Sequence, residues 1–260
     1  MSPNTKELKL AVLIDADNVP YRNVKGMMEE IAKFGTPTTK RIYGDWTKPN
    51  AAGWKSVLLE HAITPIQQYS YTVGKNSSDS ALIIDAMDLL YSDKLDGFCI
   101  VSSDSDFTRL AIRLRESGMK VIGIGEKKTP NSFIVACDRF IYIEVLDGAT
   151  SKKSPKRAAS NTAIVMGTKK EVPKTLNKVD LPTIELIEST IEDIGDDDGW
   201  AFLGDVGNLI VKKKPEFDPR NYGFNKLTPM LKSLTEILEI DERDSDKKGI
   251  KHVYVRLRFS

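Results

Sequence analysis

Cysteine and histidine are scarce in this chain of 260 residues, which contains two of each. Cys99 lies in a predicted strand and Cys137 in a predicted helix, so we expect buried, reduced thiols rather than a disulfide framework. His61 and His252 are far apart in the sequence and share no zinc-binding spacing with the cysteines. The sequence therefore gives no pattern for a zinc site.

Long hydrophobic runs are also missing. The longest, such as residues 10–14 and 81–84, are far shorter than the roughly 18 to 20 residues of a membrane span. Residues 1–9 have no signal-peptide core. With 40% hydrophobic and 29% charged residues, the chain has the composition of a globular protein with one large and one small domain. We expect a cytoplasmic protein that has no membrane partner.

The net charge of +1 hides an uneven distribution of charged residues. Residues 1–149 carry 18 basic and 19 acidic side chains, residues 150–182 carry 8 and 2, and residues 183–260 carry 12 and 16. The basic middle segment lacks aromatic residues and an apolar period, which predicts a flexible linker. Two interpretations stay open, a solvated tether and a segment that adds sequence-independent affinity for phosphates.

Strand and helix patterns alternate through residues 1–149, which predicts a parallel sheet covered on both faces, an α/β fold. The predicted strands are residues 8–14, 38–43, 64–71, 97–101, 119–124 and 140–145. The predicted helices are residues 21–34, 51–61, 78–91, 107–117 and 132–136. Gly35 and Gly118 are expected to end two of these helices.

Residues 183–260 follow a different pattern. Three groups of apolar residues at helical spacing precede an alternating segment that reads as a terminal hairpin. Three helices and a hairpin predict a small winged-helix (α+β) domain. Such a domain can bind a nucleic acid or another protein, and its acidic composition leaves both interpretations open. Trp200, Tyr222 and Phe224 are either base-stacking residues or anchors of the core and turns, and we favour the second reading.

Three acidic clusters stand where predicted strands end or helices begin: residues 15–18 (DADN), 78–80 (SDS) and 102–106 (SSDSD). In an open parallel sheet the carboxyl ends of the strands share one edge, where ligands bind. We therefore expect convergence of Asp15, Asp79, Asp104 and Asp106. Carboxylates without histidine or cysteine select a hard cation, Mg²⁺ or Mn²⁺. Such a cation activates water and stabilises charge on a phosphate.

Several neighbouring residues have roles other than binding the cation, or roles that the sequence leaves open. Asn18 can orient water or a phosphate, or it can cap the next helix. Asp17 alternates with Asp15 and is expected to point away from the site. Asp85 shares a helical stripe with core residues, which predicts an ion pair rather than a metal contact. We assign substrate-binding roles to Asn18, Lys75, Ser102 and Ser103, and treat Arg22, Arg41 and Arg109, in or near edge loops, as surface charges.

The clusters together resemble a known family. Residues 12–18 (VLIDADN), 75–79 (KNSSD), 101–107 (VSSDSDF) and 136–140 (ACDRF) are similar to the NYN domain, which has a PIN-like nuclease fold. The resemblance covers residues 8–146. It implies a metal-dependent ribonuclease with Asp15, Asp79, Asp104 and Asp106 as the catalytic and metal-binding residues.

The C-terminal part resembles a second family, the OST-HTH or LOTUS domain. The segments that carry this resemblance are residues 199–201 (GWA), 221–224 (NYGF) and 253–257 (VYVRL). The resemblance implies RNA binding, so we expect single-stranded or structured RNA as the partner. A homodimer stays an open possibility.

Two other functions fit parts of the sequence. Residues 15–19 (DADNV) also fit the opening of haloacid-dehalogenase-like phosphatases, in which Asp15 would be a covalent nucleophile and Asp17 a general acid. The stronger alternative is an RNA-binding adaptor that keeps the acidic pocket without turnover.

Overall fold

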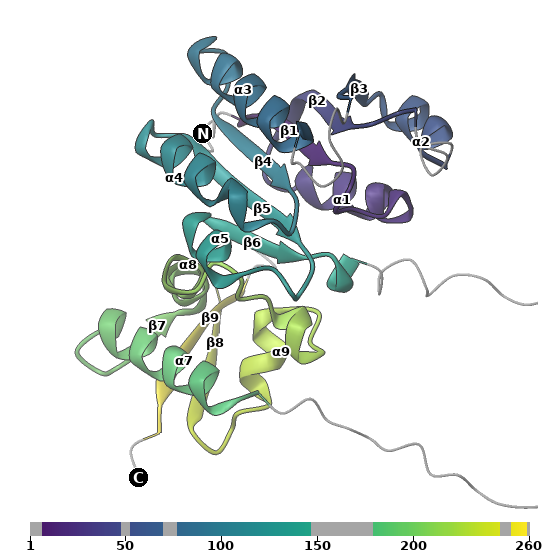
Figure 1. Ribbon diagram of the computed structural model, residues 1–260. Coiled ribbons are helices and arrows are strands. Elements are labelled where there is room, and N and C mark those ends of the chain that lie inside the picture. The colour runs from purple at the N-terminus through teal and green to yellow at the C-terminus, as the bar shows by residue number, and fades with distance from the viewer. Residues whose placement is uncertain (1–6, 48–52, 70–76, 147–178, 245–250, 259–260) are drawn as a thin grey trace, which may run out of the picture. The chain divides into compact units, whose positions relative to one another are not determined.

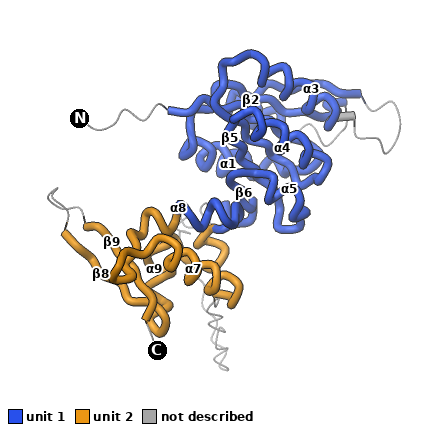
Figure 2. Tube along the Cα trace, turned by 90° about the vertical axis from the view of Figure 1, so that its left-hand side faces the viewer, with its two compact units in different colours: residues 1–149, 208–217 blue, residues 150–207, 218–260 orange. Residues whose placement is uncertain are grey.

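The computed structural model describes residues 7–47, 53–69, 77–146, 179–244 and 251–258 (Figure 1). The chain divides into two compact units, residues 1–149 with 208–217, and residues 150–207 with 218–260 (Figure 2). Most of the predicted linker lies outside the described residues. Helix α7 (Leu181–Ile194) begins within the last two positions assigned to that linker.

The first unit contains a six-stranded sheet in the order β3-β2-β1-β4-β5-β6, in which every neighbouring pair is parallel. Its strands are β1 (Lys9–Asp15), β2 (Thr36–Gly44), β3 (Thr64–Gln67), β4 (Gly97–Val101), β5 (Lys120–Gly125) and β6 (Arg139–Tyr142). The strand order reverses between β1 and β4, and open parallel sheets bind ligands at the carboxyl ends beside such a reversal. The predicted α/β fold is confirmed and is consistent with a PIN-like architecture.

Helices cover both faces of this sheet (Figure 1). They are α1 (Val24–Ile31), α2 (Trp54–His61), α3 (Ser77–Tyr91), α4 (Thr108–Glu116) and α5 (Asn131–Ala136). Leu10, Val12 and Ile14 of β1 pack on the face with α1 and α2, whereas Ala11 and Leu13 pack on the face with α3, α4 and α5. Strand β1 is buried on both faces because residues 10–14 are all apolar.

Three predicted boundaries are wrong. The strand predicted for residues 64–71 ends at Gln67. The strand predicted for residues 140–145 ends at Tyr142, and residues 144–146 are helical. Ile143 and Leu146 both enter the core, and this spacing of three residues suits a helical turn better than a strand. The helix predicted for residues 21–34 is a short 3₁₀ helix, η1 (Tyr21–Asn23), followed by α1, which ends at Ile31.

Of the two glycines expected to end helices, only Gly118 does so. Gly118 follows α4 with a φ of 79°, the left-handed conformation that glycine adopts without a steric penalty. Gly35 instead approaches the start of β1, where a Cβ atom would lie 2.3 Å from the carbonyl oxygen of Leu8. Gly35 is therefore required for close backbone packing and not as a helix cap.

The second unit has the three helices and the hairpin that the sequence predicts, together with one extra short strand. Its elements are α7, β7 (Ala201–Phe202), α8 (Leu203–Lys213), the 3₁₀ helix η4 (Pro219–Tyr222), α9 (Leu227–Lys232), β8 (Leu238–Asp244) and β9 (Lys251–Leu257). Helix α8 extends across the boundary between the two units. The strands form an antiparallel sheet in the order β7-β9-β8. Tyr222 donates to or accepts from Thr183 at 2.7 Å, which suits the predicted anchoring role of this aromatic residue.

Two further expectations concern cysteines and membranes. Cys99 and Cys137 are both buried and form no disulfide. Burial raises the pKa of the Cys99 thiol and raises that of Cys137 to about 12, so both thiols are protonated at neutral pH. Within the described part of the chain, no helix is both long and apolar enough to span a membrane.

Asp85 anchors α3 to β2. Its carboxylate accepts hydrogen bonds from the guanidinium of Arg41 and from the hydroxyl of the fully buried Tyr43. The ion pair predicted for Asp85 is therefore present. Arg41, however, is a residue of β2 and not of an edge loop, and its alternation places it on the α3 face with Tyr43. Burial and the bond to Asp85 raise the pKa of the Tyr43 hydroxyl, which keeps it protonated as a donor.

Asp85→Ala is expected to lower the free energy of unfolding by about 1–3 kcal/mol, because the buried Tyr43 hydroxyl loses its acceptor and Arg41 loses its partner. Asp85→Asn should cost less, since an amide oxygen can still accept from Tyr43. Asp88→Ala, an exposed aspartate on the same helix, should change stability by less than about 0.5 kcal/mol. Urea unfolding of the three variants measures this, and equal effects at positions 85 and 88 would contradict the anchoring role.

Candidate metal centre

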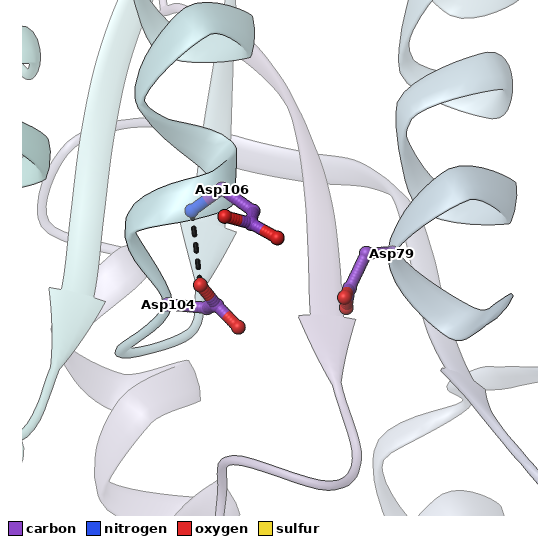
Figure 3. Close-up of side chains that lie close together, drawn as sticks. All are labelled: Asp79, Asp104 and Asp106. Atoms are coloured by element: carbon purple, nitrogen blue, oxygen red, sulfur yellow. Dashed lines mark hydrogen bonds between the residues drawn. The ribbon is translucent and has the colours of Figure 1, made fainter. Parts of the chain in front are cut away.

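Three of the predicted acidic residues converge. Carboxylate oxygens of Asp79, Asp104 and Asp106 all lie within 4.8 Å of one another, and we call these three residues the carboxylate cluster. Figure 3 shows Asp79 on α3, facing the loop that carries Asp104 and Asp106. That loop leaves the carboxyl end of β4, and Asp79 lies in the first turn of α3. The cluster therefore forms at the carboxyl edge of the sheet, beside the reversal of strand order.

Asp104 and Asp106 are held by the local geometry of their loop. Asp104 is the N-cap of the 3₁₀ helix η3 (Ser105–Phe107), and its carboxylate accepts the backbone N–H of Asp106 at 2.9 Å. The second oxygen of Asp104 takes no part in this hydrogen bond (Figure 3). Helix capping thus explains one oxygen of Asp104 and does not explain the approach of Asp79 and Asp106.

Burial and like charges perturb Asp79. Desolvation is the largest cause, followed by the charges of Asp15, Asp104, Asp106 and Asp17, and together they raise the pKa of Asp79 to about 6. A carboxyl group whose pKa is raised by burial and by neighbouring negative charges is a candidate member of a functional site.

Asp15 lies outside the carboxylate cluster, although its charge is felt by Asp79. Its side chain is 1% exposed, and one carboxylate oxygen accepts hydrogen bonds from the amide of Asn18 at 2.5 Å and the hydroxyl of Ser102 at 2.9 Å. The other oxygen accepts the backbone N–H of Asp17 at 3.1 Å. Burial raises the pKa of Asp15, and these three donors oppose that rise.

Ser102 connects the two adjacent strand ends. Its hydroxyl donates to Asp15 and accepts the backbone N–H of Asp104 at 3.1 Å, while its own backbone N–H continues the pairing of β4 with β5. The hydroxyl of Ser103 accepts the backbone N–H of Glu126 at 2.8 Å. Both serines are buried, so their hydroxyls serve hydrogen bonds within the protein. Their predicted substrate-binding roles have no support from exposed atoms.

The remaining predicted site residues are placed as follows. Asn18 donates to Asp15 and caps no helix, because η1 begins after Pro20. Asp17 is exposed, as expected from its alternation with Asp15. Lys75 lies outside the described residues.

Two other acidic residues also follow a strand directly but do not belong to the carboxylate cluster. Asp45 follows β2 directly, and Glu126 follows β5 directly. Asp45 accepts hydrogen bonds from Thr47 and Gln67, and Glu126 forms an ion pair with Lys128 at 2.6 Å. The acidic residues after β2 and β5 are therefore bound to neighbouring polar or basic side chains, whereas those at the ends of β1 and β4 are joined to each other through Ser102.

The carboxylate cluster fits a divalent cation. Its donors are oxygens only, they lie close enough to share one ion, and all three residues are partly or fully accessible to solvent. A cation would also remove the repulsion that raises the pKa of Asp79. By contrast, a pocket of about 700 Å³ at the amino ends of the strands, lined by Asp96, Lys120 and Asp138, contains none of the predicted site residues.

Comparisons with known proteins agree with these observations. The family model for the NYN domain matches residues 9–144, and the model for the OST-HTH/LOTUS domain matches residues 174–250. A search of curated proteins finds no match.

Two solved structures have partial likeness to the chain. A protein of unknown function from Vibrio parahaemolyticus is 19% identical, with a TM-score of 0.46, and the match covers 54% of this chain and 94% of that one. An uncharacterized protein from Nitrosomonas europaea is 29% identical, with a TM-score of 0.27, and the match covers 42% and 92%.

NYN domains belong to the PIN-like nuclease superfamily and generally use divalent metals, whereas OST-HTH/LOTUS domains are RNA-binding. The two matches together support an RNA-related nuclease. Because the first match spans more than half of the residues, the chain belongs to the NYN domain family, and an OST-HTH/LOTUS domain follows in its C-terminal part.

Proposed function

We propose that this protein is a ribonuclease that hydrolyses RNA phosphodiester bonds with Mg²⁺ or Mn²⁺ held at the carboxylate cluster. The observation that carries the proposal is the approach of Asp79, Asp104 and Asp106 to within 4.8 Å at the ligand-binding edge of the sheet. Membership of the NYN family supports the nuclease activity, and the OST-HTH/LOTUS match supports RNA as the substrate.

The acidic side chains would have different roles in such a site. Asp79, Asp104 and Asp106 would hold the cation, which when bound neutralises charge on the phosphate and activates the attacking water. Asp15, with its hydrogen bonds to Asn18 and Ser102, would complete the negative field and fix the ends of β1 and β4. In this proposal Asp15 belongs to the site as a positioning residue behind the three residues that would hold the cation.

The buried state of Asp15 argues against a phosphatase of the haloacid-dehalogenase type. A covalent nucleophile must present an oxygen to the phosphate, and Asp15 is 1% exposed with both carboxylate oxygens accepting hydrogen bonds. Asp17 is exposed, but it has no accessible nucleophile beside it. The nuclease proposal makes use of the observed geometry, whereas the phosphatase does not.

The domain organisation completes the proposal. Residues 1–149 would be the nuclease domain, residues 183–260 the RNA-binding domain, and residues 150–182 a basic linker whose eight Lys and Arg residues attract phosphates. The nuclease domain itself is close to neutral in charge. RNA would then be retained mainly by the C-terminal part of the chain.

Purified protein is expected to cleave labelled RNA with Mn²⁺ or Mg²⁺ and to be inactive in EDTA. Asp79→Asn and Asp104→Asn should each reduce the cleavage rate by about 100-fold or more, the scale of losing one electrostatic group from an active site. Asp88→Asn, the same substitution at an exposed position of α3, should leave the rate within about twofold, as is usual for surface substitutions. Gel analysis of single-turnover reactions measures all three rates.

Two outcomes would contradict the nuclease. Equal cleavage by the wild type and both cluster variants would identify a contaminating enzyme. Binding of RNA without cleavage, over several RNAs and both metals, would establish the RNA-binding adaptor in its place.

The raised pKa of Asp79 predicts a pH-dependent stability in EDTA. The folded protein binds the Asp79 proton more tightly than the unfolded chain does, because the pKa is about 6 instead of 3.8. The stabilisation from this proton is complete below the unfolded pKa and is lost as the pH rises through about 6. The free energy of unfolding should therefore fall by about 1 kcal/mol between about pH 4 and pH 7, a figure reduced for solvent screening of this half-exposed group.

Urea unfolding of the wild type and of Asp79→Asn at several pH values isolates this contribution. Asp79→Asn should flatten the fall and be the more stable protein at pH 7 in EDTA, although it has lost activity. Mn²⁺ should stabilise the wild type more at pH 7 than at pH 5, because protons compete with the cation. Parallel pH curves for the two proteins, with no response to Mn²⁺, would count against a metal at this cluster.

A further inference from the structure

The antiparallel sheet of the second unit has one buried face and one outward face. Ala201 of β7, Leu238 of β8 and Val255 of β9 are at most 1% exposed, so their side chains form the core side of the sheet. Side chains alternate between the two faces of a strand. The neighbours of these residues in sequence therefore lie on the opposite face, and Phe202 and Tyr254 are directly paired there.

Aromatic rings gather on this outward face. The ring of Phe202 lies 5.7 Å from that of Tyr254 and 5.5 Å from that of His252, measured between centroids. Phe202 is 37% exposed, although a phenylalanine usually faces a core. Trp200 precedes β7 and joins the same face through its contacts with the arginines described next.

Two guanidinium groups lie over these rings. Arg243 of β8 is 4.2 Å from the ring centroid of Tyr254 and 5.3 Å from that of Trp200, and Arg256 of β9 is 4.6 Å from that of Trp200. We call Trp200, Phe202, Arg243, His252, Tyr254 and Arg256 the aromatic–arginine face.

Carboxylates hold both arginines in place. Arg243 donates to Asp241 at 2.8 Å, and Arg256 donates to Glu239 at 2.9 Å. These exposed ion pairs contribute little to stability, but they orient each guanidinium. They also give the face as many carboxylates as guanidiniums, so phosphates alone have little electrostatic reason to bind it.

The combination suits the bases of an RNA more than its backbone. The outward side of an antiparallel sheet is normally polar, and aromatic rings on such a surface bind unpaired bases by stacking. Guanidinium planes stack on bases as well, and oriented guanidinium and carboxylate groups can hydrogen-bond to base edges. Paired bases in a duplex have no free stacking face for this surface.

We propose that the aromatic–arginine face binds unpaired nucleotides of RNA through their bases. The inference rests on the proposed function in taking RNA as the ligand, and it assigns the recognition of bases to a surface separate from the carboxylate cluster. Binding there should depend on bases and respond weakly to salt, in contrast to the phosphate attraction expected of the basic linker.

The test uses the full chain carrying Asp104→Asn, so that the RNA stays intact, and a labelled single-stranded RNA of about 12 nucleotides at about 150 mM salt. Fluorescence anisotropy should show that Phe202→Leu and Tyr254→Leu each weaken binding by about five- to fiftyfold, the range for losing one stacked base. Arg243→Lys should also weaken binding, because it keeps the charge and removes the plane. An abasic oligomer with the same number of phosphates should bind weakly, and equally to all these proteins.

Lys232→Ala is the matched control for charge, since Lys232 pairs with Glu242 outside the aromatic–arginine face, and its affinity should stay within about twofold of the parent. Thermal melting shows whether each variant is folded. Because Phe202 is exposed, Phe202→Leu should disturb folding less than Tyr254→Leu.

RNA binding that is unchanged in folded Phe202→Leu and Arg243→Lys would overturn the inference and direct attention to a protein partner for this face. Equal affinity of the parent for the RNA and the abasic oligomer would overturn it as well. The nuclease is judged separately, by cleavage with the unmodified chain, so either proposal can fail while the other stands.

Discussion

Repulsion among carboxylates is the constraint on which the candidate metal centre depends. Three carboxylates lie within 4.8 Å of one another, and burial, followed by the charges of the neighbouring carboxylates, raises the pKa of Asp79. Flexible side chains would relieve the repulsion by rotating apart. The site therefore depends on a rigid backbone around it, and the adjacent strands β1 and β4, buried at residues 10–15 and 97–101, supply that rigidity.

Hydrogen bonds extend this rigidity to the segments that carry the carboxylates. Ser102 joins the buried Asp15 to the backbone of Asp104, so the end of β1 and the loop after β4 are held by one hydroxyl group. On the other side, Asp85 fixes α3 to β2 through Tyr43, which is the register partner of Asp15. The loop that carries Asp104 is thus tied to β1, and the helix that carries Asp79 is tied to β2, the neighbour of β1 in the sheet. A cation would be bound by a preformed site at little cost in conformational entropy.

Much of this arrangement could be predicted from sequence, because it follows from short-range patterns. Apolar runs ending in aspartate indicate buried parallel strands whose carboxyl ends carry ligands, and Asp79, Asp104 and Asp106 do converge. The same pattern cannot tell which strand end matters, since Asp45 and Glu126 follow strands equally directly. Nor can it reveal that Ser102 is buried as a bridge, because its partners are far away in the sequence. Strand order and long-range hydrogen bonding decide these points.

The outward face of the C-terminal sheet is another feature that the sequence predicts only in part. The alternation of Val253, Val255 and Leu257 identifies β9 as a strand with one apolar side. His252, Tyr254 and Arg256 alternate with equal regularity, but only the pairing with β7 and β8 shows that Phe202 and Arg243 join them. The carboxylate cluster attracts a cation but has no groups that bind bases. The aromatic–arginine face carries equal numbers of carboxylates and guanidiniums, so it attracts phosphates only weakly. The proposed ribonuclease would need contacts to phosphates and contacts to bases, and the charge of each surface suits it to one of the two.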